Sequence, residues 1–319
     1  MRAFSVFDLH CDTAEPLLRT GQGLNDNTCH VSLKRAKHLA RYAQFFAFCT
    51  YGDQGSRYGF PEPEVFFAQM LANFRAQLDR NGDSLCLCAG AETLRRAEET
   101  KKCAVFLSLE GAEAIACDPG RLDWLREQGF TMTTLTWNSA NALAGSHETG
   151  EGLTPRGREF VRKAQKLDIL VDVSHLSERA FWEVCELAEK PIVASHCNSR
   201  SCCNCSRNLS DEQLKAISAA GGVIGLNLYA PFLNPGGQAE LSDVRRHGEH
   251  ILELCGAEHL VLGGDLDGCD ALPAGFSGLD DYNGLGAYLV QNGWTKELTQ
   301  DVFYNNMARF VQKNLGKTE

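Results

Sequence analysis

The feature that most constrains the fold of this chain is an alternation of short apolar runs with longer segments of helical spacing. Such alternation is typical of βαβ units, in which helices join parallel strands. Eight runs are predicted to be strands: residues 4–9, 43–50, 103–109, 131–136, 169–173, 191–195, 223–228 and 259–263. Eight parallel strands predict an α/β fold of the (β/α)8 TIM-type barrel class. The chain has 319 residues, and we expect one barrel domain over 1–319.

Helix boundaries support the barrel. Thr154, Ser177 and Ser210 are N-cap residues placed directly before segments of helical spacing. Further helices, each ended by a glycine, are expected over 279–315, after the last strand. An open doubly wound sheet would usually carry a glycine-rich phosphate loop after its first strand, and neither G-x-G-x-x-G nor G-x-x-x-x-G-K-[ST] occurs. The closed barrel is therefore the better prediction.

Charge and composition narrow the class of partner. The formal net charge of −10 argues against a nucleic-acid groove, which needs clustered positive charge. No run approaches the roughly twenty apolar residues of a membrane span, and the N-terminal residues lack the apolar region of a secretory signal. We therefore expect a cytoplasmic protein that acts on small molecules. Its fourteen cysteines are expected to stay reduced.

Ionisable side chains gather where the predicted strands end. They are His10 and Asp12 after the first strand, Glu110 after the third, His175 after the fifth, His196 after the sixth and Asp265 after the eighth. The C-terminal ends of barrel strands share one face, where such barrels build active sites. Each residue alone has an ordinary explanation, such as a helix cap or a glycine turn. Three histidines and three carboxylates on one rim together indicate zinc or a similar divalent ion.

The chain resembles the membrane (renal) dipeptidase family, which are metallopeptidases of the amidohydrolase superfamily. The resemblance covers roughly residues 6–312 and rests on the motifs His10-Cys-Asp12, Leu109-Glu110-Gly111, Val171-Asp-Val-Ser-His175, Ser195-His196, Ser206-Arg207-Asn208 and Gly263-Gly-Asp265-Leu-Asp-Gly268. It implies that His10 and Asp12 hold one zinc ion and that His175 and His196 hold a second. It also implies that Glu110 bridges the two ions.

The same resemblance implies the reaction. Asp265 is expected to orient the attacking water and to pass its proton to the leaving amine. Arg207 is expected to bind the terminal carboxylate of the substrate with its planar guanidinium group. The leading interpretation is a binuclear zinc dipeptidase for free dipeptides, including those with a C-terminal D-residue. A homodimer is expected from the resemblance alone.

One stretch departs from the family. Trp137 stands where better-known members carry a histidine that assists at the substrate carbonyl. An indole can donate one hydrogen bond but cannot take a proton or bind zinc. Either this role is dispensable, or Asn138, Asn141 or His147 in the same loop covers it. Trp137 and Asn138 are therefore candidate substrate contacts.

Two other functions stay open. One is a different metal-dependent amidohydrolase reaction, on a carboxylate-bearing amide or lactam. The other is a non-catalytic barrel that keeps its metals only for structure. Within the loop that leads to Arg207, the cysteine-rich segment 197–205 is interpreted as reduced thiols, because its spacing does not match a paired zinc motif. His247 and His250, three apart in a helical segment, are expected at the surface.

Overall fold

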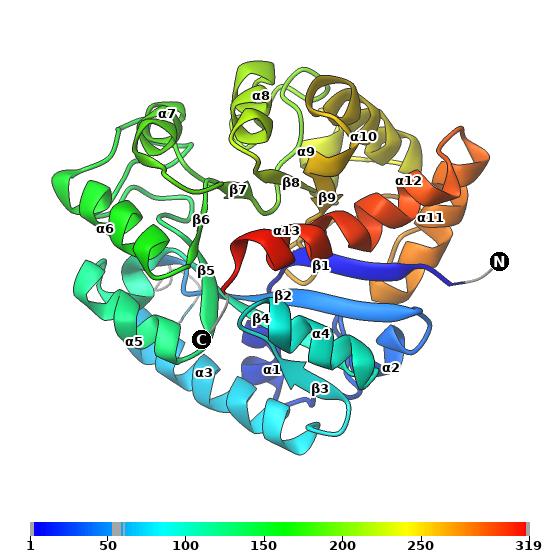
Figure 1. The fold of residues 1–319 in the computed structure, drawn as a ribbon, viewed down its shortest axis with the longest axis horizontal. Coiled ribbons are helices and arrows are strands. Elements are labelled where there is room, and N and C mark those ends of the chain that lie inside the picture. The colour runs from blue at the N-terminus through cyan, green and yellow to red at the C-terminus, as the bar shows by residue number, and fades with distance from the viewer. Residues whose placement is uncertain (1–2, 53–58, 60, 317–319) are drawn as a thin grey trace.

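The computed structural model describes residues 3–52, 59 and 61–316, and its centre is a parallel β-barrel (Figure 1). Its strands are β1 (Ser5–Cys11), β2 (Arg41–Cys49), β3 (Leu85–Leu87), β4 (Cys103–Glu110), β5 (Phe130–Thr134), β6 (Leu170–Asp172), β7 (Val193–Ala194), β8 (Val223–Leu226) and β9 (Leu260–Leu262). The strands pair in the order β2-β1-β9-β8-β7-β6-β5-β4, and β2 also pairs with β4. This pairing closes an eight-stranded ring, so the predicted (β/α)8 fold is confirmed.

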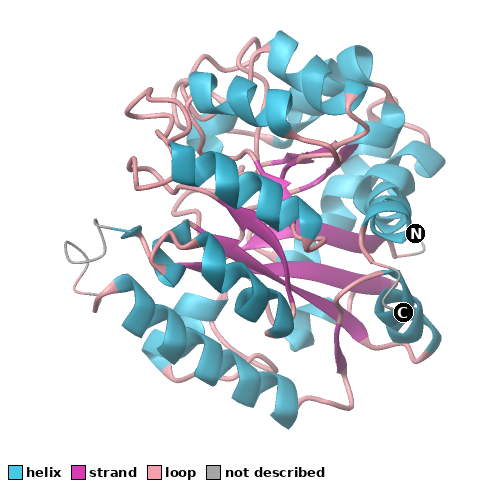
Figure 2. Ribbon diagram, turned by 60° about the vertical axis from the view of Figure 1, so that its left-hand side comes forward, coloured by secondary structure: helices cyan, strands magenta, loops and turns pink. Residues whose placement is uncertain are grey.

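Helices surround the ring and connect successive strands along the chain (Figure 2). They are α1 (Ala14–Thr20), α2 (Leu33–Ala36), α3 (Pro63–Arg80), α4 (Ala91–Glu99), α5 (Leu122–Glu127), α6 (Pro155–Lys166), α7 (Glu178–Leu187), α8 (Asp211–Ala219), α9 (Ala230–Leu233), α10 (Leu241–Cys255), α11 (Tyr282–Gln291), α12 (Lys296–Gln300) and α13 (Asn306–Asn314). A π-helical segment, Asp301–Asn305, joins α12 to α13. None of the helices among the described residues is both long and apolar enough to cross a membrane.

The predicted helix caps are present. The hydroxyl groups of Thr154, Ser177 and Ser210 each accept a hydrogen bond from the backbone N–H three residues later. These bonds satisfy N–H groups that the first helical turn leaves without partners. Gly293 and Gly316 follow the C-terminal helices with φ angles of +109° and +44°, a backbone conformation that suits glycine.

The barrel interior is filled and one end is covered. The rings of Phe7 and Phe45 lie 5.4 and 4.8 Å, centre to centre, from that of Phe106, in one buried cluster with residues of α13. The side chain of Asn306, at the start of α13, donates to the carbonyl of Leu260 at the start of β9. In Figure 1, α13 lies across the ring. The C-terminal helix therefore covers the N-terminal mouth of the barrel, and the opposite rim carries the predicted site.

Two features differ from the sequence-based prediction. The short strand β3 was not predicted, and it pairs with the first residues of β4 outside the closed ring. The prediction that His247 lies at the surface is wrong, because its side chain is fully buried. His247 accepts a hydrogen bond from the N–H of Ser199 and donates one to the carbonyl of Leu233. The inward face of α10 packs on these loops, which spacing within the helix alone does not reveal.

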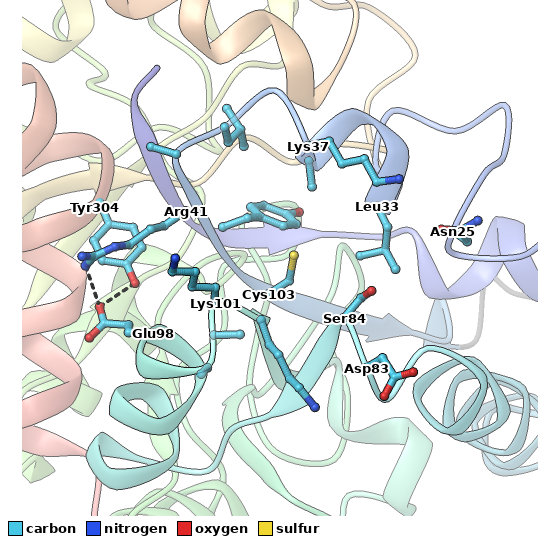
Figure 3. A pocket seen from close by; sticks show the side chains of 17 residues that line it. Asn25, Leu33, Lys37, Arg41, Asp83, Ser84, Glu98, Lys101, Cys103 and Tyr304 are labelled. Carbon is cyan, nitrogen blue, oxygen red and sulfur yellow. Dashed lines mark hydrogen bonds and ion pairs between the residues drawn. The ribbon is translucent and has the colours of Figure 1, made fainter. Parts of the chain in front are cut away.

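A cavity of about 460 Å³ opens near the starts of β2 and β4 (Figure 3). Lys37, Arg41 and Lys101 lie around it, and Glu98 pairs there with Arg41 and with the hydroxyl of Tyr304. Its lining, as far as the chain is described, contains none of the predicted site residues. It is therefore separate from the candidate site at the other rim.

Candidate metal centre

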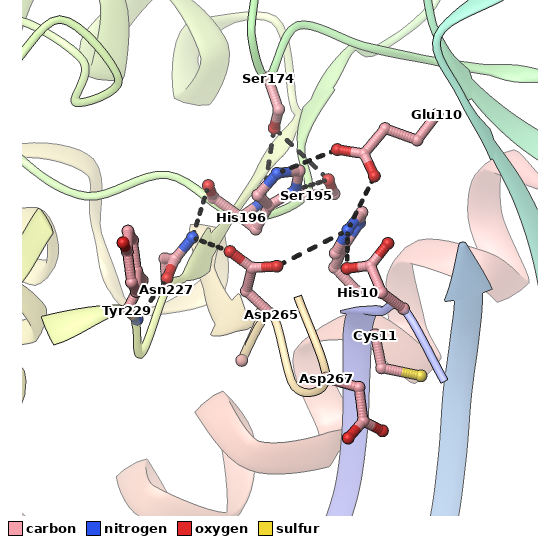
Figure 4. Close-up of polar contacts among 12 residues, drawn as sticks. His10, Cys11, Glu110, Ser174, Ser195, His196, Asn227, Tyr229, Asp265 and Asp267 are labelled. Carbon is pink, nitrogen blue, oxygen red and sulfur yellow. Dashed lines mark hydrogen bonds and ion pairs between the residues drawn. The ribbon is translucent and has the colours of Figure 1, made fainter. Parts of the chain in front are cut away.

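The predicted ligands converge at the C-terminal rim of the barrel (Figure 4). Each follows or ends a strand: His10 lies within β1, Asp12 directly after it, Glu110 at the end of β4, His175 after β6, His196 after β7 and Asp265 after β9. All six are buried, with at most 9% of any residue exposed. The parallel strands thus place six residues from five strands in one site.

The site divides into two halves on either side of Glu110. In the first, here called the carboxylate half, the Nε2 atom of His10 lies 3.2 Å from Oδ2 of Asp12 and 3.9 Å from Oδ1 of Asp265. In the second, the imidazole half, the Nε2 atoms of His175 and His196 are 3.0 Å apart. Oε2 of Glu110 lies 3.4 Å from His10, and its Oε1 lies 2.9 Å from His175 and 3.6 Å from His196. Glu110 therefore directs one oxygen toward each half.

Hydrogen bonds fix which nitrogen of His196 carries a proton. The hydroxyl of Ser195 donates to Oδ2 of Asp172, so its oxygen is left to accept from Nδ1 of His196 at 2.7 Å. In a neutral imidazole the other nitrogen then bears a lone pair. The Nε2 atom of His196 thus directs a lone pair toward Glu110, as metal binding requires.

The donor set fits a cation. Two groups of side chains, His10 with Glu110 and His196, and His10 with Asp12 and Asp265, each bring ligand atoms within 4.8 Å of one another. Among the described residues, Nε2 of His10 is buried without a hydrogen-bond partner. Converging acceptors and imidazole lone pairs repel one another unless a proton or a metal ion lies between them. Imidazole and carboxylate together suit zinc or a similar divalent ion.

Burial and charge separate the pKa values of the two halves. Burial raises the pKa of Asp12 to about 8, with the neighbouring Glu110 carboxylate adding to the effect. Burial lowers the pKa of His175 to about 4, and Arg207 adds to this shift. Burial alone would lower the pKa of His10, but Glu110 and Asp12 raise it well above its usual range. Burial thus favours the neutral imidazole of His175, the form that binds a metal ion, whereas the nearby carboxylates favour the protonated form of His10.

Two buried aspartates brace the rim from below. Oδ1 of Asp8 accepts from the N–H groups of His10 and Gly264, at 3.0 and 2.9 Å. Oδ1 of Asp172 accepts in the same way from Ser174 and Ser195, both at 3.0 Å. Each carboxylate thus ties the end of its own strand to the neighbouring strand. The sequence analysis missed both, although each lies two residues before a polar strand end.

Asn227 is a further residue that the sequence analysis missed. It follows β8, and its side-chain N–H donates to Oδ2 of Asp265 at 3.1 Å and to the carbonyl of His196 at 3.2 Å. This contact leaves Oδ1 of Asp265 directed toward His10. The sequence offers no clear signal for it, because Asn227 lies inside the predicted strand over 223–228.

The backbone around Asp265 is tightly constrained. Asp265 and Asp267 have φ angles of +57° and +68°, a region that aspartate tolerates better than most residues. A Cβ atom on Gly268 would lie 2.3 Å from Oδ2 of Asp12 and 2.4 Å from Oδ1 of Asp265. Asp267 points away from the ligands and accepts from Thr13 and from the N–H of His30. The glycine turn therefore admits the two carboxylates, and Asp267 anchors a neighbouring loop.

Arg207 lies buried beside the imidazole half. Its guanidinium group donates to the carbonyl of His196 at 3.4 Å and to the sulfur of Cys197 at 3.5 Å, and it lies 5.5 Å from the ring centre of Phe232. Its Nε atom is buried without a partner, and no ion pair links it to a carboxylate among the described residues. A buried cation of this kind is costly without an anion. Arg207 is therefore suited to receive one.

The loop after β5 holds the residues that depart from the family. The rings of Trp137 and Tyr51 meet edge to face at 5.1 Å, and Trp137 lies 6.4 Å from the ring of His175. Oδ1 of Asn138 accepts hydrogen bonds from His175 and His147. Among the described residues, the side chain of Asn141 bonds only to backbone groups of its own loop, which are those of Leu135, Leu143 and Ala144. Substrate contacts by Trp137 and Asn138 stay predictions.

The cysteines take no part in the candidate centre. All fourteen lie in the described residues as free thiols. The side-chain groups that could hold a metal ion, within the ranges described, do not include Cys197, Cys202, Cys203 or Cys205. The segment 197–205 instead forms the loop that carries Arg207 to the rim.

Comparisons with known proteins identify the family. The family signature of membrane dipeptidase (peptidase family M19) matches residues 1–318. An uncharacterized protein from the pqqA 5' region of Klebsiella pneumoniae is 31% identical over 266 residues, which cover 80% of this chain and 97% of that protein. A metallopeptidase from Rhodobacter sphaeroides, solved with a phosphinate mimic of the dipeptide L-Ala-D-Ala, is 26% identical with a TM-score of 0.90, covering 98% of this chain and all of that one.

The probable dipeptidase PvdM from Pseudomonas aeruginosa shares the fold, with a TM-score of 0.85 at 19% identity over 98% of this chain and 96% of its own. The family match spans nearly the whole sequence, and it includes every strand end that contributes to the rim. From the match over 1–318 and the site geometry together, we conclude that this chain belongs to the membrane dipeptidase family of metallopeptidases.

Proposed function

We propose that this protein is a zinc-dependent dipeptidase with two metal ions, which hydrolyses free dipeptides, including those with a C-terminal D-residue. The observation that carries the proposal is the position of Glu110 between the two halves, with Oε2 toward His10 and Oε1 toward His175 and His196. A carboxylate placed in this way is suited to bridge two ions. His10 and Asp12 would hold one ion, and His175 and His196 the other.

When bound, such ions supply Lewis acidity and a water of lowered pKa. Asp265 is assigned the proton transfer. Its Oδ1 faces the ligand cluster while Asn227 holds its Oδ2, so the free oxygen is placed to orient the water and accept its proton. The same carboxyl group then returns the proton to the leaving amine. Burial raises the pKa of Asp265, which strengthens its carboxylate as an acceptor of the water's proton.

Arg207 is assigned the substrate carboxylate. A buried guanidinium without a carboxylate partner among the described residues gains two charge-assisted hydrogen bonds when an anion binds. This fits a free dipeptide, whose terminal carboxylate lies a short distance from its peptide bond. The Rhodobacter sphaeroides metallopeptidase was solved with a mimic of L-Ala-D-Ala, and we extend that substrate class to this chain.

The test is hydrolysis of a dipeptide panel with L- and D-residues at the second position. Zinc-loaded protein, chelated protein and chelated protein restored with zinc are compared for release of free amino acids. Release that is lost on chelation and restored by zinc is the expected result. No release from any dipeptide, despite about two bound ions per chain, would overturn the proposal. Activity on a carboxylate-bearing lactam or acylamino acid would then favour the other amidohydrolase reaction. A cytoplasmic location and a homodimer stay predictions.

A further inference from the structure

A chain of hydrogen bonds runs from the loop of Arg207 to the imidazole half. The hydroxyl of Ser206 lies 2.8 Å from Nδ1 of His147, and Nε2 of His147 lies 3.0 Å from Oδ1 of Asn138. The same Asn138 oxygen lies 2.9 Å from Nδ1 of His175. Four side chains from the loops after β5, β6 and β7 therefore form one connected path that ends at a predicted metal ligand.

The chemistry of the groups sets the direction of every bond. A carboxamide oxygen only accepts, so both imidazoles donate to Asn138. His147 then has its proton on Nε2, and its Nδ1 accepts from the hydroxyl of Ser206. His175 has its proton on Nδ1, which leaves the lone pair of Nε2 facing Glu110 at 2.9 Å. This is the only neutral form of His175 in which Nε2 can bind a metal ion.

We propose that His147 is a positioning residue that clamps the side chain of Asn138 and thereby fixes the proton and ring of His175 for metal binding. The inference rests on the proposed metal centre and goes beyond it. Asn138 alone could turn its amide by half a rotation and present its N–H₂ group to His175. The ring Nε2–H of His147 opposes that rotation, since the rotated amide would face it with N–H₂ unless His147 moved its proton to Nδ1 and Ser206 turned to accept it.

Backbone contacts hold His147 in place. The backbone N–H of His147 donates to the carbonyl of His175 at 2.8 Å, and the neighbouring Ser146 pairs with Leu176 in an isolated β-bridge. Both ring nitrogens of His147 are engaged, one by Ser206 and one by Asn138.

The test measures zinc affinity, not turnover alone. Zinc dissociation constants are determined by competition with a chelator for the unmodified protein and for His147→Leu, His147→Gln and His250→Leu. His147→Leu is expected to bind one of the two ions about 10- to 100-fold more weakly, the usual cost of losing a residue that orients a ligand. In His147→Gln the new amide can donate to Asn138 and accept from Ser206, so its affinity is expected to stay close to that of the unmodified protein. His250 bonds Asp211 between α8 and α10, so His250→Leu is the matched control without an effect.

Two results would overturn the positioning role. One is unchanged zinc affinity in His147→Leu, and the other is affinity in His147→Gln as weak as in His147→Leu. If His147→Leu fails to fold, as judged by thermal unfolding of the metal-free protein, His147→Ala takes its place. It also removes the ring N–H that faces Asn138, so the same loss of zinc affinity of about 10- to 100-fold is expected, and unchanged affinity would overturn the role. A protein that binds two ions but hydrolyses no dipeptide refutes the proposed function alone, because this inference is judged by affinity.

Discussion

The two halves of the candidate centre are held in different ways. In the carboxylate half, Asp12 and Asp265 lie beside His10 directly, and the supporting Asp8 contacts backbone N–H groups. In the imidazole half, side chains support side chains, with Ser195 and Asp172 behind His196. The pKa values in the two halves also move in opposite directions, since burial raises the pKa of Asp12 to about 8 and lowers that of His175 to about 4.

This difference predicts which kind of substitution impairs each half. The carboxylate half depends on placing negative charge, so removal of a carboxylate changes the chemistry. The imidazole half depends on which nitrogen carries the proton, so a substitution that leaves every ligand in place can still weaken metal binding. The following predictions test that distinction, beginning with the largest effect.

Asp265→Asn is expected to reduce turnover by about 10²- to 10⁴-fold, the range of general acid and base catalysis, while both ions stay bound. Asparagine tolerates the left-handed backbone at this position, so the turn should be kept. Metal content by elemental analysis and kcat on the best dipeptide provide the measurement. Near-normal turnover, or loss of metal with turnover, would contradict the assigned proton transfer.

Asp172→Asn is expected to weaken zinc binding in the imidazole half by about 10- to 100-fold. The new N–H₂ group would donate to Ser195, whose hydroxyl would then donate to Nδ1 of His196 and leave the ring proton on Nε2. Asp8→Asn is the matched control, because Asp8 accepts from the backbone of His10 and not from its ring. Chelator competition on both variants is the measurement. Equal losses of zinc affinity in the two variants would show that the two halves do not depend on different kinds of support.

Arg207→Lys is expected to raise KM for dipeptides about tenfold, with kcat nearly unchanged, because an ammonium group loses one of two charge-assisted hydrogen bonds. Steady-state kinetics on a dipeptide and on its C-terminal amide separate the effect. The amide, which lacks the carboxylate, should respond little to the substitution. A similar rise in KM for both substrates would exclude carboxylate binding by Arg207.

Trp137→His is expected to have the smallest effect, a change in kcat/KM of less than about tenfold. A histidine that assists the reaction contributes about 10²-fold or more, and the proposed scheme assigns proton transfer to Asp265. Kinetics on paired L,L and L,D dipeptides would measure the change. A gain of a hundredfold would show that the family's histidine role is unfilled in this chain.

The barrel and the convergence of ionisable side chains at its rim were predictable because two strong patterns coincide. All eight predicted runs became strands of the ring, and the polar residues that follow them converge because parallel strands end on one face. The short strand β3 was missed because three residues carry too little periodicity to identify. The assignment of roles to Glu110 and Arg207 came from the family resemblance, not from spacing.

Contacts between distant segments explain the remaining differences. Asp8 and Asp172 lie inside apolar runs, and their partners Gly264 and Ser195 are brought to them only by strand pairing. Asn227 lies beyond the last apolar residues of its strand, and only its distance to Asp265 reveals its role. His247 was misplaced because helical spacing identifies a shared face but not what covers it.

The pairing of β1 with β9 also has a consequence for the timing of assembly. The N–H of Asp265 donates to the carbonyl of His10, so the first ligand and the proposed proton carrier are joined by backbone across most of the chain. A ribosome that adds about 5 to 20 residues per second completes Asp265 roughly 13 to 50 seconds after His10. A nascent chain therefore holds His10 and Asp12 ready while their partners are still unmade. Closure of the rim between β1 and β9 therefore waits for residue 265, and a chain terminated before that point would lack the proposed proton carrier.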